Sequence, residues 1–219
     1  RGFCGTVASG EVRQGDTIMA LPSGKSAVVK SVLTPAGEEN IGFVGQAVTV
    51  TLDREIDISR GDMIVRADET LPNVSQAFDS YIVWMNENPL VPGKEYAFKL
   101  GGKTVFGRIE KVLHRIEINT FDHIAADQLG LNEIGLCRVV VNAPVVFDAY
   151  RICRGTGSLI VIDRLSNATA GAGMIAATAE ADVELQRAHI EAVLLGMSEQ
   201  DLHDFVTRHY PHWGVKPLS

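Results

Sequence analysis

The stretch from Ile162 to Ile175, "IDRLSNATAGAGMI", decides the fold of the second half of the chain. An apolar run ends at Asp163, polar residues follow, and a Gly-Ala-Gly triplet then leads into Met174 and Ile175. Such glycines form either the floor of a phosphate site or a strand that lies very close to its neighbours. A phosphate loop would continue into a capped helix, whereas Met174 and Ile175 continue a strand. The pattern therefore predicts a β-hairpin whose glycines are structural.

The residues up to about 177 repeat this pattern of short β-branched runs divided by turn residues. Gly, Pro, Asn and Asp stand between the runs, and no strong helical period appears, which argues against a parallel sheet with crossover helices. The runs are TVASG, DTIMAL, SAVVKSVL, AVTVTL and DMIV in the first 66 residues, followed by FDSYIVWM, EYAFKL, KTVFGRIEKVLHRIEI, LCRVVVNA, SLIVID and ATAGAGMI. Their spacing predicts an all-β fold of antiparallel strands.

The domain organisation follows from a break in this pattern. Residues 66–76, RADETLPNVSQ, are polar and acidic and contain a proline, which is typical of a linker between compact units. We therefore expect two antiparallel β-barrels, over residues 1–70 and residues 71–177, followed by a linker and a short α-helical tail over residues 178–219. A chain that begins with Arg1 rather than Met is expected to be a piece of a longer protein.

The period becomes helical after residue 177. A first expected helix places apolar residues and one long arginine stem on a single face and ends near a glycine. These residues are Val183, Arg187, Ile190 and Leu194, with Gly196 as the stop.

A second helix is expected from Ser198, which can cap it, to Pro211, which ends it. Its apolar stripe supplies the candidate interface residues, together with a tryptophan that follows: Leu202, Phe205, Val206 and Trp213. Short helices rarely persist without packing partners, so the alternative is a mobile tail with two marginal helices.

The charge distribution argues against nucleic-acid binding. The 219 residues carry a net charge of −7, from 20 Lys and Arg against 27 Asp and Glu. Basic and acidic residues number 7 and 10 over residues 1–70, 10 and 10 over residues 71–175, and 3 and 7 over residues 176–219. Because no segment is basic, binding to a phosphate backbone has no obvious source of counterion release.

The sequence also indicates the compartment. It contains no run of about 18 apolar residues that would span a membrane, and no basic stretch with an apolar core typical of a secretory signal. The three cysteines, Cys4, Cys137 and Cys153, are odd in number, far apart and flanked by apolar residues. They are expected to be buried free thiols in a reducing, cytoplasmic environment.

Gly24-Lys25-Ser26 is similar to the end of a phosphate-binding P-loop, but the residue five positions before Gly24 is Met19 instead of glycine. The residues after Ser26 are β-branched and predict a strand, so the helix N-terminus that would bind phosphate is missing. A hairpin turn is the favoured interpretation.

The other short motifs are weaker. Asp127 to Gly130 matches a bare Asp-x-x-Gly, which arises by chance, and no Asn-Lys-x-Asp motif accompanies it. His209 and His212 in "HYPHW" are interrupted by Pro211 and lack further ligands, so they do not predict a metal site. Ser59 to Asp62 is expected to be a tight turn before a strand. The spacing of residues predicts no catalytic site, no cofactor site and no metal site in this chain.

Several ordered stretches resemble elongation-factor-Tu-like GTPases. RGFCGTVASGEVRQGDTI, GFVGQAVTVTL and DISRGDMIV are similar to their second domain, and GSLIVIDRLSNATAGAGMI is similar to the last hairpin of their third domain. The versions YIVWM, IDRLSNATAGAGMI and RHYPHWG resemble one branch, the GTPase large subunit of bacterial sulfate adenylyltransferase. The resemblance covers nearly the whole chain and is weakest over residues 178–197.

This resemblance implies a C-terminal fragment with part of the first barrel, truncated at its N-terminus, all of the second barrel, and the tail. The family's GTP-binding domain precedes the barrels, so GTP and magnesium are expected in the parent protein and not in this chain. The parent would couple GTP hydrolysis to the reaction of ATP and sulfate to adenylyl sulfate and diphosphate. Its implied partner is the small subunit that transfers the adenylyl group, and this piece would be a scaffold for domain and subunit contacts.

The alternative is the tRNA-binding barrel pair of a translational elongation-factor GTPase, which shares the architecture. The balanced charge of residues 71–175, the acidic tail and the HYPHWG ending favour the sulfate-activating family.

Overall fold

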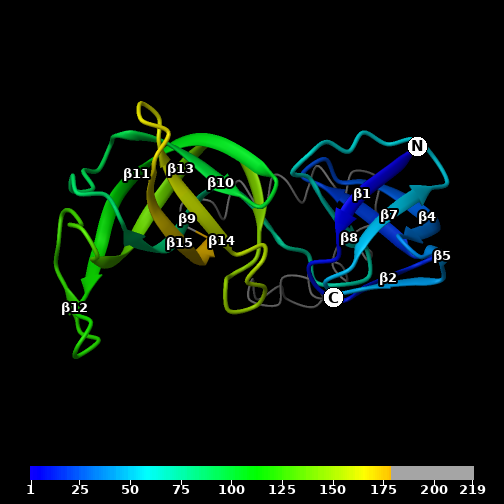
Figure 1. Ribbon diagram of the computed structural model, residues 1–219, viewed down its shortest axis with the longest axis horizontal. Helices are drawn as coiled ribbons and strands as arrows, with labels where there is room; N and C mark the ends of the chain where they lie inside the picture. Colours follow the sequence, from blue (N-terminus) through cyan, green and yellow to red (C-terminus); the bar gives the residue numbers. More distant parts are fainter. Residues whose placement is uncertain (179–219) are drawn as a thin grey trace, which may run out of the picture. The chain divides into compact units, whose positions relative to one another are not determined.

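The computed structural model describes residues 1–178, which are built from β-strands and connecting turns (Figure 1). The predicted all-β class is confirmed. The chain divides into two compact units, the first formed by Arg1–Pro72 and the second beginning at Asn73. Within residues 1–178 no helix is long and apolar enough to cross a membrane. The two expected helices of the tail, with Leu202, Phe205, Val206 and Trp213, lie outside the described residues.

The first unit is built around one antiparallel sheet. Its strand order is β1-β7-β4-β3-β8, and β5 also pairs with β4. The strands are β1 (Gly2–Thr6), β3 (Thr17–Leu21), β4 (Lys25–Thr34), β5 (Gly37–Glu39), β7 (Ala47–Leu52) and β8 (Met63–Arg66). A separate two-stranded sheet joins β2 (Glu11–Arg13) to β6 (Ile41–Phe43). Alternation along these strands turns small apolar side chains inward, and the core consists of Ile18, Ala20, Ala27, Val29, Val32, Val48, Val50 and Ile56.

The first sheet is open, whereas residues 1–70 were expected to form a β-barrel truncated at its N-terminus. Its path ends at β1 and β8, and no pairing joins these two strands among the described residues. Both terminal strands are short, with five and four residues respectively. The first expected run, TVASG, is also misplaced, because the strand covers Gly2–Thr6 and the chain bends at Ser9 and Gly10.

The second unit contains a closed six-stranded antiparallel barrel. Each strand pairs with two neighbours in the ring β10-β14-β15-β9-β13-β11, and the pairing of β10 with β11 closes it. The strands are β9 (Asn73–Trp84), β10 (Glu95–Leu100), β11 (Lys103–Ile116), β13 (Ile134–Phe147), β14 (Ser158–Asp163) and β15 (Thr169–Thr178). The short β12 (His123–Ile124) adds to the end of β11. Ring closure removes the unpaired edges that an open sheet exposes.

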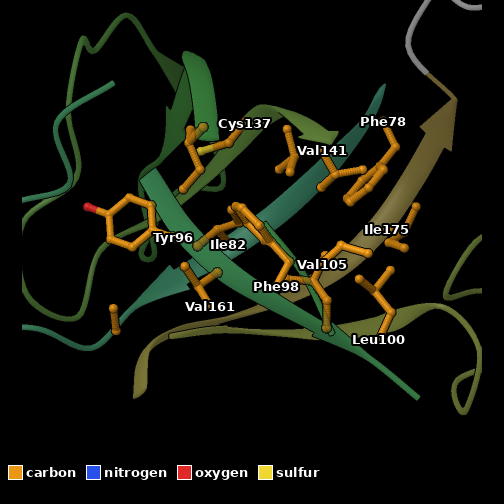
Figure 2. Close-up of a cluster of buried hydrophobic side chains, with 14 of the residues drawn as sticks. Phe78, Ile82, Tyr96, Phe98, Leu100, Val105, Cys137, Val141, Val161 and Ile175 are labelled. Carbon is orange, nitrogen blue, oxygen red and sulfur yellow. The ribbon is translucent and has the colours of Figure 1, made fainter. Parts of the chain in front are cut away.

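Large apolar side chains fill the interior of the barrel, as Figure 2 shows. Phe78, Phe98 and Val161 come from three different strands and are all fully buried. The ring of Phe78 lies 5.2 Å from that of Phe147, and the ring of Trp84 meets Tyr96 edge-on at 5.7 Å. The indole Nε1 of Trp84 donates to the carbonyl oxygen of Asn88 at 2.8 Å, so this buried donor is satisfied.

The glycines of the opening stretch are structural, as predicted. Gly171 and Gly173 lie on β15, between β14 and β9, and point into the barrel. A Cβ on Gly171 would stand 2.9 Å from the carbonyl oxygen of Val83, and one on Gly173 would stand 2.8 Å from Cδ1 of Leu159. Only glycine allows β15 to approach its neighbours this closely.

The polar segment expected to be a linker is shorter than its composition indicated. Residues 73–76 of RADETLPNVSQ belong to β9, where Val74 pairs with Val146. Ser75 is buried there, and its hydroxyl donates to the carbonyl oxygen of Ala77 at 2.6 Å. A small polar residue can enter a barrel wall when its hydroxyl is satisfied locally, which composition alone does not reveal.

Candidate functional site

The sequence Gly24-Lys25-Ser26 forms a hairpin turn between β3 and β4, as predicted. Gly24 has a positive φ of 71°, and its N–H donates to the carbonyl oxygen of Ala20 at 2.7 Å. Lys25 is already the first residue of β4 and pairs with Ala20. The amide of Gly24 is therefore occupied within the turn, and the strand that follows provides no helix N-terminus for a phosphate group.

The segment from Ser59 to Asp62 is also a tight turn, immediately before β8. Asp62 N–H donates to the carbonyl oxygen of Ser59 at 3.0 Å, and Ser59 N–H donates to Oδ2 of Asp62 at 2.8 Å. This reciprocal pair is a local Asx-type turn and confirms the prediction.

The Asp-x-x-Gly match has a structural role. Leu129 is fully buried, and its carbonyl oxygen accepts the N–H of Leu90 at 2.8 Å, so the loop is fixed against the barrel end. Gly130 N–H donates to Oε2 of Glu133 at 2.7 Å. That hydrogen bond, with an ion pair to Arg115, lowers the pKa of Glu133. The open groove beside this loop is about 640 Å³ in volume, and two of the charges that line it, Arg115 and Glu133, are paired with each other.

The cysteines meet the expectation only in part. Cys137 and Cys153 are buried cysteines that form no disulfide, and burial raises the pKa of Cys137 to about 12. Cys4 is exposed, and the prediction of burial is wrong there. It lies on β1, which pairs on one side only, and its Sγ is 3.2 Å from Oγ1 of Thr49. Over residues 1–178, no three or more His, Cys, Asp or Glu side chains gather as metal ligands.

A buried carboxylate fixes the hairpin of the opening stretch. Oδ1 of Asp163 accepts the N–H groups of Leu165 and Ser166, each at 3.0 Å. Its Oδ2 accepts Nζ of Lys94 at 2.7 Å. The sequence predicts a turn at Asp163 but not its partner Lys94, which stands 69 positions away. The lysine hydrogen bond, followed by those of the turn, holds the pKa of Asp163 far below its usual range.

Two histidines stack at the open end of β11. The rings of His114 and His123 lie 3.9 Å apart at an interplanar angle of 13°, and Tyr81 meets His114 edge-on at 6.4 Å. Burial, and then the neighbouring His123, lowers the pKa of His114. Nε2 of His114 is buried and has no hydrogen-bond partner among the described atoms. Neither histidine was singled out by the sequence, because their stacking depends on the pairing of β11 with β12.

The outside of the barrel carries a continuous apolar surface. In one row, cross-strand pairing connects Ile160 to Ala172, Ala172 to Val83, Val83 to Ile134 and Ile134 to Ile116. In the adjacent row it connects Met174 to Tyr81, Tyr81 to Leu136 and Leu136 to His114. We call the apolar members of these rows the outer apolar face: Tyr81, Val83, Ile116, Ile134, Leu136, Ile160, Ala172 and Met174.

The outer apolar face is partly accessible to solvent. Ile160 is exposed and the other members are half-buried. Ala172 and Met174 line a shallow groove of about 430 Å³ with Val83 and Ile160, and Lys99 stands in its lining. Exterior positions of a solvated barrel are usually polar, so an apolar surface five strands wide is typical of an interaction site.

The comparisons with known proteins define the class of the fold. Residues 77–176 match the family described as "GTP-eEF1A C-terminal domain-like". A crystal structure of Sup35 complexed with GDP matches 82% of this chain and 46% of that chain, with a TM-score of 0.73 and 13% identity. A second Sup35 structure, with GMPPNP, gives a TM-score of 0.72 at 13% identity. The second unit is thus an eEF1A-like C-terminal domain, and the likeness to Sup35 is one of fold alone.

Curated relatives identify the family more narrowly. Sulfate adenylyltransferase subunit 1 of Chromobacterium violaceum is 56% identical over 211 residues, which cover 96% of this chain and 43% of that protein. The subunit 1 of Shewanella woodyi is 48% identical over 219 residues, 100% of this chain and 45% of that protein. The chain spans less than half the length of these relatives. It is a homologue of sulfate adenylyltransferase subunit 1, and the resemblance inferred from its sequence is confirmed.

Proposed function

We propose that this chain supplies the barrel domains and tail of the GTPase large subunit of a bacterial sulfate adenylyltransferase. The observation that carries the proposal is the 56% identity to a subunit 1 over 96% of the chain. In this proposal residues 1–70 and 71–177 are two barrel domains, and residues 178–219 are a linker and helical tail. The sheet of the first unit and the closed barrel of the second support this arrangement.

The parent protein then takes part in cytoplasmic sulfate assimilation, where ATP and sulfate give adenylyl sulfate and diphosphate and GTP is hydrolysed. GTP and magnesium would be bound by a GTPase domain of the parent, and the adenylyl transfer would occur on the small subunit. The relative from Chromobacterium violaceum is a "subunit 1", which supports the existence of a partner subunit. We assign no catalytic or cofactor-binding role to any residue of this chain.

The role proposed for this chain is that of a scaffold that contacts the GTPase domain and the small subunit. One feature of the second unit supports it. The interior is packed with large apolar side chains, which makes the barrel a rigid support. In the tail, we propose that Leu202, Phe205, Val206 and Trp213 form a further contact.

The test is a graft into a working enzyme. The chain replaces the matching part of subunit 1 from Chromobacterium violaceum, and the chimera is combined with that organism's small subunit. We expect GTP-dependent formation of adenylyl sulfate, because the two sequences agree at 56% of the aligned positions. The control graft carries the barrels of Sup35, which share the fold at 13% identity and should not support the reaction.

A folded chimera that binds the small subunit but forms no adenylyl sulfate in response to GTP would contradict the proposal. The translational alternative is tested with the same chain by a mobility-shift titration with aminoacyl-tRNA. The balanced charge of residues 71–175 leads us to expect no saturable shift at physiological salt. A micromolar complex with tRNA would favour the alternative.

A further inference from the structure

The chain leaves the second barrel beside the outer apolar face. Strand β15 contributes Ala172 and Met174 to this face and continues in the same direction to Thr178. A chain that reverses after Thr178 needs about four residues, or roughly 14 Å, to return to Met174. The segment that follows Thr178 is therefore within covalent reach of an apolar groove.

We propose that the segment from Val183 to Leu194 docks on the outer apolar face, across β14, β15 and β9. The segment has the periodicity that this requires, because Val183, Ile190 and Leu194 share one face of the helix expected there. The remaining member of that face, Arg187, can lay its aliphatic stem on apolar surface and keep its charge in water.

The dimensions agree with this occupant. A helix of 12 residues is about 18 Å long at a rise of about 1.5 Å per residue. Strands β14, β15 and β9, on which the segment is proposed to dock, are separated by two strand spacings of about 4.8 Å, or roughly 10 Å in all. One helix of this length therefore crosses this three-strand part of the face, while the part on β13 and β11 curves away around the closed barrel.

The charges are complementary as well. Residues 179–196 contain four acidic residues, Glu180, Asp182, Glu184 and Glu191, against the single Arg187. The groove has Lys99 in its lining, and Arg154 adjoins the lining residue Gly155 with its guanidinium 6.0 Å from the ring of Tyr150. Exposed pairs of this kind add little affinity, but they favour one orientation of the segment over its reverse.

The tether makes this segment a stronger competitor than a free partner. A connection of only four residues between Thr178 and Val183 holds the segment near the groove at an effective concentration in the millimolar range. A second copy of the chain or the partner subunit would need to displace it. Such occupants are therefore alternatives that the experiment must separate.

The test measures access to the groove in the intact chain. Ala172→Cys places a small thiol in the groove, and Cys4→Ser removes the exposed native thiol, so that Cys137 and Cys153 remain as buried background. We expect the thiol of this variant to react with a maleimide about tenfold more slowly than it does after Ile190→Glu is added. Ala192→Glu is the matched control, because it lies on the opposite side of the expected helix and should leave the rate unchanged. Circular dichroism checks that each variant is folded.

Three results would overturn the proposal. Equal labelling rates for the Ile190→Glu and Ala192→Glu variants would show that the segment does not cover the groove. If the thiol introduced by Ala172→Cys is protected from maleimide only at high protein concentration, and light scattering shows a monomer–dimer transition, the face would be assigned to a second copy of the chain. Protection that appears only when the small subunit is added would assign it to that partner.

Discussion

Nζ of Lys94 and Oδ2 of Asp163, 2.7 Å apart, connect the segment just before β10 to the last residue of β14. The same carboxylate accepts the N–H groups of Leu165 and Ser166 and so organises the hairpin that leads to β15. One side chain thus fixes both a long-range pair of strands and a local turn. The first prediction concerns this carboxylate.

Asp163→Asn should lower the Tm of the second unit by a few degrees, because the lysine loses its charged acceptor. The lysine hydrogen bond keeps the folded-state pKa of Asp163 far below the unfolded value of 3.8. The stability contributed by the carboxylate is therefore present above about pH 4 and is lost as the pH falls toward the folded-state pKa. Chemical denaturation at pH 7 and pH 3 should show that the gap between wild type and variant narrows in acid.

The reciprocal variant, Lys94→Met, provides the control for this pair. In the wild type, the hydrogen bond to Asp163 raises the pKa of Lys94 above 10.5. The stability that the charged lysine contributes is therefore present below pH 10.5 and is lost as the pH rises through the folded-state pKa. The gap between this variant and wild type should persist in mild acid and narrow only in alkali. A gap that is equally wide at pH 3 and pH 7 for Asp163→Asn would contradict the assignment.

The second prediction concerns the stacked histidines. Burial lowers the pKa of His114 below the model-compound value of 6.5, so the unfolded chain binds a proton that the folded chain resists. Stability should therefore decline as the pH falls from about 6.5 through the folded-state pKa. Arg115, the residue after His114 on β11, is paired with Glu133. His114→Phe should keep the ring contacts and show a smaller drop in Tm between pH 7.5 and pH 5.5.

His123→Asn separates the two causes. This variant removes the neighbouring histidine but leaves His114 buried, and burial is the larger cause of its lowered pKa. The variant should therefore recover only part of the stability that the wild type loses in acid. If His114→Phe and wild type lose stability in parallel, the decline in this pH range belongs to other groups.

The third prediction concerns Gly173. A Cβ at this position would lie 2.8 Å from both Cδ1 of Leu159 and Oγ of Ser80, inside the closed barrel. Gly173→Ala should therefore destabilise the second unit by about 1–3 kcal/mol through overpacking. Gly155→Ala is the matched control, since a Cβ there meets nothing within 4 Å. Urea denaturation that gives equal midpoints for the two variants would show that the barrel wall yields easily.

The fourth prediction is that this chain alone neither binds nor hydrolyses GTP. The proposed function places the nucleotide site in another domain of the parent, and Gly24-Lys25-Ser26 is a hairpin turn whose amide at Gly24 is occupied. Calorimetric titration with GTP and magnesium should give no saturable heat. A micromolar Kd would show that the barrels carry a nucleotide site of their own.

The fifth prediction concerns the proposed contact of the tail. Complete burial of an apolar side chain stabilises by about 1.5–3 kcal/mol. Phe205→Asp should therefore weaken binding to the small subunit about tenfold or more, or lower the Tm if the tail packs on a barrel. Thr207→Asp, which is off the expected stripe, is the matched control. Unchanged affinity and unchanged Tm for Phe205→Asp would make the tail a passive tether.

The features that the sequence predicted well are those with a local cause. The glycines 171 and 173, the turn at Asp163 and the hairpin at Gly24 each depend on residues that are adjacent in the chain. The long strands also carried enough β-branched residues to be recognised. Strands such as β2, β5 and β6, with three residues each, are too short to show a period.

The features that the sequence did not predict depend on pairing between distant strands. Lys94 finds Asp163 only because β10 lies beside β14, and Cys4 is exposed because β1 pairs on one side only. The outer apolar face shows the same limit. Its members Tyr81 and Val83 alternate with buried Ile82 and Trp84, so the run is apolar on both sides and does not reveal which side faces out.

The ring of six strands has a mechanical consequence. Its first strand, β9, and its last, β15, are antiparallel neighbours, and Phe78 in the middle of β9 pairs with Thr178 at the end of β15. A force that pulls these two ends apart acts across the ladder, along its hydrogen bonds, and loads the pairs one after another from Phe78 and Thr178 onward. The barrel should therefore unzip at low tension when it is stretched by its ends, although its closed ladder protects it from thermal fraying.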